Sequence, residues 1–243
     1  MLRSKLAGGA VVFCAAFLEP AFAQGGDEIV VTGARLQRFA ADVVPSVYLE
    51  RNADFVLISY DFICDTRDAK SREDELRRTL EGLLAGAARR DDIELSTIVE
   101  YEDAYDTLYF TKPYTQVATG DFKGQYGRSD TSVQTVIIKT PVGKNDVNIE
   151  SAIGRIESFI DGVKMNGRTI AVSSEEVQLS VVDVERYRED LTAKIIADVK
   201  GQRDLVGGGA IELSGLENVV RWERSGPMQL TIYLPYKVAV AID

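Results

Sequence analysis

Hydrophobic positions along this chain follow two periods, and each period predicts a different element. Two-residue alternation or a short continuous apolar run indicates a strand, whereas apolar positions three and four apart indicate one face of a helix. Strands are therefore expected at residues 47–49, 54–64, 94–102, 133–140, 169–172, 177–182, 211–222 and 228–242. The run 54–64 is the longest of the early strands and is rich in β-branched and aromatic residues, which favour a pleated, half-buried surface.

Three segments carry apolar residues at helical spacing. Residues 71–74 resemble a capping box before the first helix, Gly162 and Gly201 end the second and third, and Asp183 is the expected cap of the third. The apolar stripes are Leu76, Leu80, Leu83, Leu84 and Ala87; Ile149, Ala152, Ile153, Ile156 and Ile160; and Tyr187, Leu191, Ile195 and Val199. Since strands outnumber helices, we predict an α+β fold: a mixed, mostly antiparallel sheet with about three amphipathic helices covering one face.

The first 23 residues have the layout of an export signal. Arg3 and Lys5 precede an apolar stretch over residues 6–18, Pro20 follows it, and the small residues Ala21 and Ala23 flank Phe22. The apolar stretch is shorter than the roughly 20 residues that cross a bilayer as a helix. We therefore expect a signal peptide over residues 1–23 that is cleaved before Gln24.

Charge and composition exclude several kinds of site. The chain has 38 acidic and 28 basic residues, a formal net charge of −10, and no histidine. An acidic chain lacks the basic face of a nucleic-acid binder, so no nucleic-acid partner is expected. Without histidine, the His-based catalytic triads and the His-ligated metal sites are excluded. No catalytic residue, cofactor site or metal site is predicted, and the acidic cluster at residues 100–106 lacks the spacing of a calcium loop.

Residues 24–45 form a segment with one short β-prone run. By its composition this segment is a flexible tether, and its strand can add to the open edge of a sheet through main-chain hydrogen bonds. Residues 27–35, DEIVVTGAR, resemble the TonB box of TonB-dependent outer-membrane receptors, which pairs with the periplasmic domain of TonB. Two interpretations stay open: the strand recruits TonB, or it docks on the sheet of this protein. The residues that would pair are Glu28, Ile29, Val30, Val31, Thr32 and Gly33.

The order of elements from about residue 47 to residue 243 resembles the SIMPL-domain family of bacterial envelope proteins. The features that carry the resemblance are the Ala53-Asp54 step into the long strand, the leucine-striped helix after it, the strand before the helix 149–160, the run SSEEVQLSVVDVERYREDLTAKIIADVKGQRDLVGG, and the closing strand LTIYLPYKVAVAI. The resemblance implies one SIMPL-like domain over residues 46–243, a periplasmic or outer-membrane-associated location, no catalysis, and ring-like homo-oligomers.

Two residue types have more than one interpretation. Five tyrosines between residues 101 and 126 form either an interface or an ordinary half-buried sheet surface, because tyrosine combines a large area with a polar tip. They are Tyr101, Tyr105, Tyr109, Tyr114 and Tyr126. Cys64 is the one cysteine that remains after cleavage, so it cannot form an internal disulfide. It is either a buried small hydrophobe or a reactive thiol.

Two functional hypotheses follow, from different classes. The first is a non-enzymatic periplasmic scaffold or adaptor linked to TonB-dependent transport. Its expected partners are the C-terminal domain of TonB, an outer-membrane receptor, and further copies of the same chain. The second is an envelope stress or redox-protection protein that uses Cys64.

Overall fold

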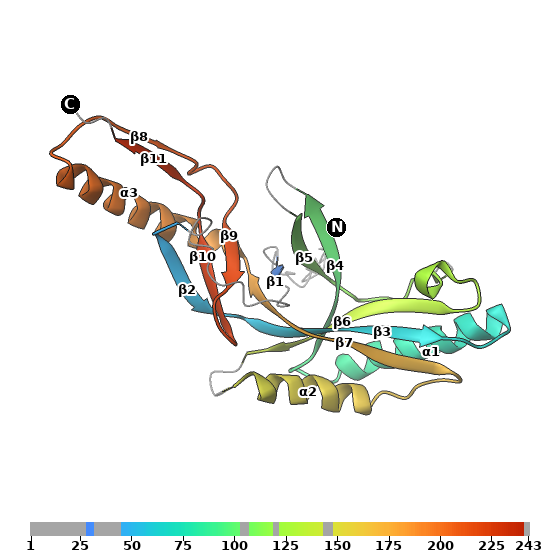
Figure 1. The fold of residues 1–243 in the computed structure, drawn as a ribbon. Helices are drawn as coiled ribbons and strands as arrows, with labels where there is room; N and C mark the ends of the chain where they lie inside the picture. The colour runs from blue at the N-terminus through green and yellow to red at the C-terminus, as the bar shows by residue number, and fades with distance from the viewer. Residues whose placement is uncertain (1–27, 32–44, 103–106, 119–121, 143–147, 241–243) are drawn as a thin grey trace, which may run out of the picture.

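The computed structural model describes residues 28–31, 45–102, 107–118, 122–142 and 148–240. These residues form an elongated molecule with a large sheet and two helices at one end and a smaller lobe at the other (Figure 1). The expected export signal over residues 1–23 lies outside the described residues.

Six strands make up the large sheet, and all of their pairs are antiparallel. In spatial order they are β1 (Glu28–Val31), β5 (Thr107–Pro113), β4 (Glu94–Glu102), β6 (Ser132–Pro141), β3 (Phe55–Cys64) and β7 (Thr169–Val182). The short strand β1 pairs with β5 on one side and with β7 on the other, which closes the six strands into a barrel. The longest ladders are those of β3 with β6 and with β7, so β3 is the central strand of the body.

Two helices cover one face of this sheet. They are α1 (Ala69–Ala87) and α2 (Ile149–Asp161), which pack on β3 and β6 (Figure 1). Each begins at a side chain that accepts a backbone hydrogen bond: Asp68 accepts from Ser71 N at 2.8 Å, and Asn148 accepts from Ser151 N at 3.3 Å. The order β3-α1-β4-β6-α2-β7 is the split β-α-β arrangement of a ferredoxin-like fold, with β5 and β1 added at its edge.

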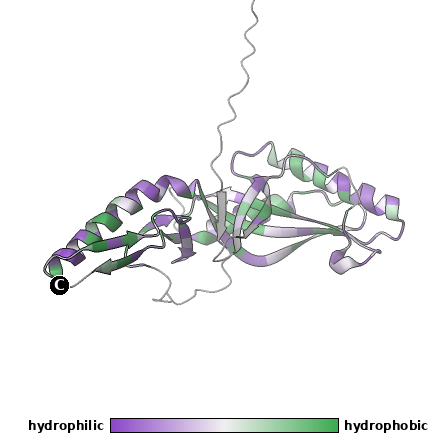
Figure 2. Ribbon diagram, turned by 90° about the horizontal axis from the view of Figure 1, so that it is seen from above, coloured by the Kyte–Doolittle hydropathy of each residue, from purple (hydrophilic) through white to green (hydrophobic). Residues whose placement is uncertain are grey.

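The smaller lobe contains the third helix and five short strands. Its elements are β2 (Tyr48–Asn52), the 3₁₀ turn η2 (Val184–Tyr187), α3 (Arg188–Leu205), β8 (Ile211–Ser214), β9 (Arg221–Arg224), β10 (Gln229–Tyr233) and β11 (Lys237–Val240). Strands β2, β10 and β9 form one sheet, and β11 pairs with β8. Figure 2 shows α3 with hydrophobic residues toward the strands and hydrophilic residues on its outer side, and Leu191, Ile195 and Val199 are buried there.

The predicted α+β class is confirmed, with three corrections to the layout of its helices and C-terminal strands. Two of the three helices cover the large sheet, whereas α3 packs in the smaller lobe. The strand expected over residues 211–222 is two strands, β8 and β9, because Gly215 at φ +92° turns the chain between them. The closing strand expected over residues 228–242 is likewise divided into β10 and β11, with Pro235 in the gap.

The two strands expected at residues 169–172 and 177–182 are one continuous strand, β7. The break that the polar residues Ser173 to Glu176 suggest is a bulge: Ile58 faces Val177 and Tyr60 faces Ser173, so extra residues on β7 oppose one residue of β3. Glu175 lies at this bulge with φ +59°. The polar run therefore marks an irregularity within a strand and not a loop.

Candidate partner-binding surfaces

The TonB-box-like segment lies in the protein's own sheet as β1. Its register is Glu28 opposite Thr111 of β5, and Glu28 to Val31 opposite Val182 to Leu179 of β7. Of the two interpretations of this segment, local docking is the one that the structure adopts. Thr32 and Gly33 lie outside the described residues. Because β1 pairs on both edges, its backbone groups must leave these ladders before they pair with another sheet.

The two halves of β7 differ in how they are paired. Residues Leu179 to Val182 pair with β1, and Leu179 and Ser180 also pair with β3. Leu179, Ser180 and Val181 are at most 1% exposed. Residues 169–173 and Val177 pair with β3 on one edge, and no other described strand pairs with their second edge. This half carries Ile170 and Val172, which are 55% and 43% exposed.

Strand alternation places Ile170 and Val172 on the face opposite the helices. Their cross-strand neighbours on β3 are Ile63 and Asp61, whereas the buried Phe62 and Cys64 point toward α1 and α2. A hollow of about 510 Å³ lies on the same side of the sheet. Its lining residues are Ile63, Asp65, Gln125, Arg128, Thr131, Arg168, Ile170 and Val172.

Charged pairs border this hollow, and an exposed tyrosine lies in the turn that contributes Gln125 to its lining. Arg168 Nε lies 2.6 Å from Asp65 Oδ1, and Arg128 Nη2 lies 2.7 Å from Asp130 Oδ2. The hydrogen bonds from Arg168 hold the pKa of the Asp65 carboxyl below its ordinary value. Tyr126, in the 3₁₀ turn η1 (Gln125–Gly127), is 95% exposed and has φ +53°. We call the group Tyr126, Arg128, Arg168, Ile170 and Val172 the distal surface.

Among the five tyrosines expected as a possible interface, only Tyr126 is strongly exposed in the described part of the chain. Tyr114 is 9% exposed, its hydroxyl has no hydrogen-bond partner among the described residues, and burial raises its pKa to about 12. Tyr109 is half-buried against Leu57 and Ile137. A surface position is thus wrong for Tyr114, because its ring fills the core. Tyr101 lies in β4, and Tyr105 lies outside the described residues.

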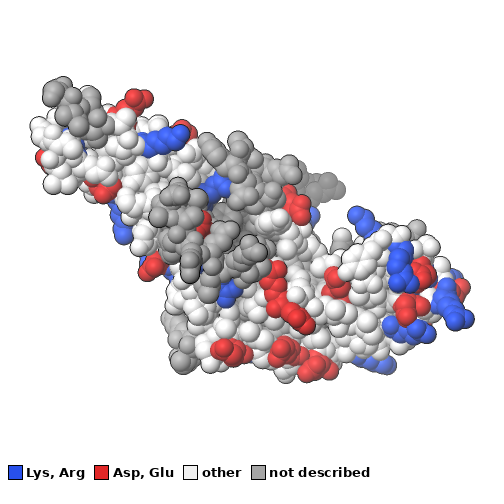
Figure 3. Space-filling view, in the orientation of Figure 1, with Lys and Arg blue, Asp and Glu red and all other residues white. Residues whose placement is uncertain are grey.

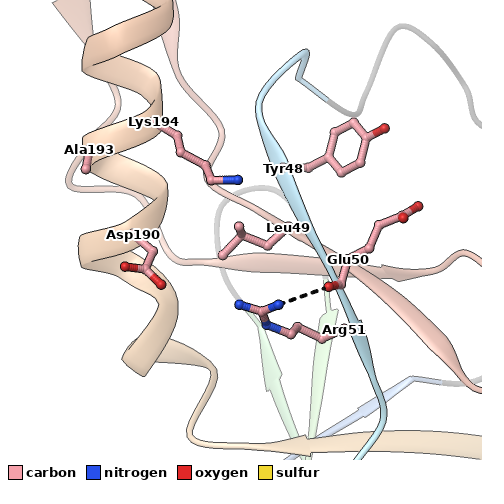
Figure 4. A pocket seen from close by; sticks show the side chains of 7 residues that line it. All are labelled: Tyr48, Leu49, Glu50, Arg51, Asp190, Ala193 and Lys194. Atoms are coloured by element: carbon pink, nitrogen blue, oxygen red, sulfur yellow. Dashed lines mark hydrogen bonds between the residues drawn. The ribbon is translucent and has the colours of Figure 1, made fainter.

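A second hollow, of about 600 Å³, lies between β2 and α3. In Figure 4, Leu49 and Arg51 point toward α3, whereas Tyr48 and Glu50 point to the other side of β2. Arg51 Nη1 donates a hydrogen bond to the Glu50 carbonyl at 3.5 Å, and Asp190 and Lys194 line the helix side. This mixture of opposite charges and small apolar surface favours no single class of ligand.

Cys64 is a fully buried residue under α1. Its Sγ donates to Glu75 Oε2 at 3.4 Å, and the same oxygen accepts from Thr66 Oγ1 at 2.5 Å and from the Arg168 backbone N–H at 3.1 Å. These donors, Thr66 foremost, lower the pKa of Glu75. Reactive cysteines are partly exposed and lie beside positive groups. The burial of Cys64 beside a carboxylate therefore favours its interpretation as a packed structural residue.

Sequence reasoning missed most of the distal surface. Ile170, Val172 and Arg168 come together with Gln125 and Arg128 only because the segment of η1 lies beside the start of β7. The one sequence signal was the β-prone run over positions 169–172, which predicts a strand. That pattern does not tell which neighbours the strand has.

Within the described ranges, no group of three or more Cys, Asp or Glu side chains is placed to hold a metal ion. No helix in that part of the chain is long and apolar enough to cross a membrane. A scan against protein-family models finds no match to this chain, and searches of curated proteins and of solved structures find none either.

Proposed function

We propose that this protein is a non-enzymatic scaffold or adaptor of the bacterial envelope. Its N-terminal strand recruits the C-terminal domain of TonB, and its body binds an outer-membrane receptor or further copies of itself. The export signal expected over residues 1–23 and the similarity of residues 27–35 to a TonB box support this location and this partner.

The observation that carries the proposal is the strand conformation of Glu28–Val31. The segment pairs antiparallel with β5 and with β7, so its backbone already makes the kind of ladder that strand addition to a partner requires. In the intact chain, TonB must compete with this internal pairing. A free peptide pays no such cost, so it binds TonB more tightly than the intact chain does.

The test compares a peptide of residues 27–35 with the full chain as ligands for the C-terminal domain of TonB. Calorimetry should detect binding of the peptide and a weaker affinity for the full chain. Val30→Pro should abolish peptide binding, because proline removes a ladder N–H. Val30→Thr is the matched control, since threonine keeps the N–H and the β-branch, and it should bind within about threefold of the natural peptide.

Absence of peptide binding at millimolar concentration would contradict the recruitment of TonB. Equal affinity of the peptide and the full chain would contradict the competition with β5 and β7. Binding that survives Val30→Pro would show that side chains, and not a main-chain ladder, hold the peptide.

A further inference from the structure

We propose that two copies of this chain join through the open edge of β7, antiparallel to each other about a twofold axis that passes beside Val172. This inference deepens the proposed function, because it gives the self-association of the scaffold a defined surface. The joined edges continue the large sheet from one copy into the other.

One edge of β7 is open among the described strands over residues 169–174. Over residues 169–174, β7 offers main-chain groups that no described strand pairs, and the exposed Ile170 and Val172 stand beside them. Proteins usually protect such an edge with a charge that points inward, a proline or a covering segment. Here the bulge at Glu175 ends the regular stretch, so the segment that can accept a partner is about six residues long.

Residues 169–174 can pair antiparallel with the same residues of a second copy. A twofold axis perpendicular to the sheet keeps the two faces of the sheet distinct, so only residues of the same face can pair across it. With the axis at Val172, Val172 faces its own copy and Ile170 faces Ser174 of the partner. The apolar side chains of both copies then lie on the face with the hollow, and the helices of both copies lie on the other.

The charges along β7 have opposite signs at the two ends of this segment. Arg168 precedes the segment and its side chain is 64% exposed, whereas Glu175 and Glu176 follow the segment. In Figure 3, Lys and Arg side chains gather at the end of the body where β7 begins, and Asp and Glu side chains gather over α2. An antiparallel arrangement sets Arg168 of each copy near the acidic end of the other copy's segment, where Glu175 and Glu176 lie. A parallel arrangement would set like charges together.

These three features favour a second copy over a foreign strand. A foreign peptide would gain the main-chain hydrogen bonds of β7 but would have to bring its own acidic and basic ends in the right order. The chain itself carries both, at matching distances from Val172.

Cysteine cross-linking tests the register directly. In the full chain with Cys14→Ala and Cys64→Ala, Val172→Cys should form a disulfide-linked dimer on mild oxidation, because directly opposed residues have Cα atoms about 5 Å apart. Ile170→Cys is the matched control. Its two copies lie about 13 Å apart in this register, so it should stay unlinked. Equal cross-linking at both positions, or none at Val172, would overturn the register.

The oligomeric state tests the surface. We expect the full chain to dimerise in sedimentation experiments, and Val172→Lys to weaken the dimer at least about tenfold, because it places two like charges opposite each other. Val99→Lys is the control: Val99 is a similarly exposed strand residue, 46% against 43%, and lies on β4. A chain that is monomeric at all concentrations would overturn the proposal, and so would equal effects of the two lysines.

A mixing experiment tests the charge arrangement. Arg168→Glu alone and Glu176→Arg alone should each dimerise at least about tenfold more weakly than the natural chain, because each sets like charges together. A mixture of the two variants should form heterodimers, since both contacts then pair opposite charges. Failure of the mixture to associate better than either variant would overturn this arrangement.

The outcome is separate from the test of TonB recruitment. A dimer through β7 can form whether or not the N-terminal peptide binds TonB. Conversely, if the peptide binds TonB but the chain stays monomeric, the adaptor proposal is supported and the β7 dimer is contradicted. Circular dichroism of each variant excludes loss of the fold as the cause of monomers.

Discussion

The two halves of β7 belong to one strand but have different surroundings. Leu179, Ser180 and Val181 pair with β1, and the first two also pair with β3. All three are buried, although neighbouring side chains point to opposite faces of the sheet. In the other half, Thr169 is buried under the helices while its neighbour Ile170 is 55% exposed. The first half is a barrel strand and the second an edge strand.

The difference follows from what lies beside and above each half. A barrel encloses one face of its strands, and the helices cover the other, so residues of both faces lose contact with water. At the open end, Ile170 and Val172 are exposed on the barrel face, and no described strand pairs with the second edge of residues 169–174. One strand therefore combines a structural segment with a surface suited to binding.

Truncation of Leu179 should give the largest effect of this comparison. Leu179→Ala deletes a fully buried side chain, so we expect a loss of about 3 kcal/mol in the free energy of unfolding. Ile170→Ala, in the open half, should cost less than about 1 kcal/mol because Ile170 is half exposed. Urea unfolding measures both. Equal losses at a concentration where the chain is monomeric would refute the contrast between the two halves.

Thiol reactivity should separate the two faces of the open half. Cys64 lies opposite Thr169 on the helix-covered face and is fully buried, so a water-soluble thiol reagent should label it at least about a hundredfold more slowly in the folded than in the unfolded chain. A cysteine at position 172, introduced by Val172→Cys, should react at once in the monomer. Fast labelling of Cys64 in the folded chain would instead support the redox hypothesis.

Acid should affect the open end through a smaller electrostatic contribution. Hydrogen bonds from Thr66 and from the Arg168 backbone lower the pKa of Glu75 in the folded chain, so the unfolded chain binds protons more readily. The stabilisation is complete above the ordinary pKa of Glu75 and disappears as the pH falls through the lowered pKa in the folded chain.

We therefore expect the thermal midpoint to fall between about pH 5 and pH 3, and to fall less steeply in Glu75→Gln. The effect is small because Glu75 is partly accessible to water. Asp65→Asn tests a second carboxyl at the same end: the side chain of Arg168 lowers the pKa of Asp65, whereas Glu75 accepts from the backbone N–H of Arg168. If the thermal midpoints of the natural chain and Glu75→Gln fall identically with pH, the Glu75 carboxylate does not contribute to stability in this way.

Most helices and strands were predictable because their patterns are local. The stripe through Leu76, Leu80 and Leu83 specified α1, and the apolar run 54–64 specified β3. Errors occurred where one residue changes the path of the chain. Gly215 and Pro235 divide two expected strands, whereas the polar run after Ser173 divides none, because a sheet tolerates a bulge without losing its strand.

The candidate surfaces were predictable in part. The β-prone run at residues 28–31 was visible in the sequence. The sequence did not show whether this run pairs with the protein's own sheet or with a partner. The tyrosine count identified Tyr126 together with Tyr114, which is buried. Residue type alone does not separate the two, because tyrosine suits a core and an interface equally well.

The sequence by itself determined the α+β class, the short strand at residues 28–31, and the lack of histidine chemistry. Three further statements stay predictions from the sequence: the export signal, the resemblance to SIMPL-domain proteins, and TonB as partner. Only the tertiary structure decided that β1 closes a barrel and that half of β7 has an open edge among the described strands. It also decided that Cys64 is buried beside Glu75. Periodicity records which side of an element is apolar, but pairing and burial depend on segments far apart in the chain.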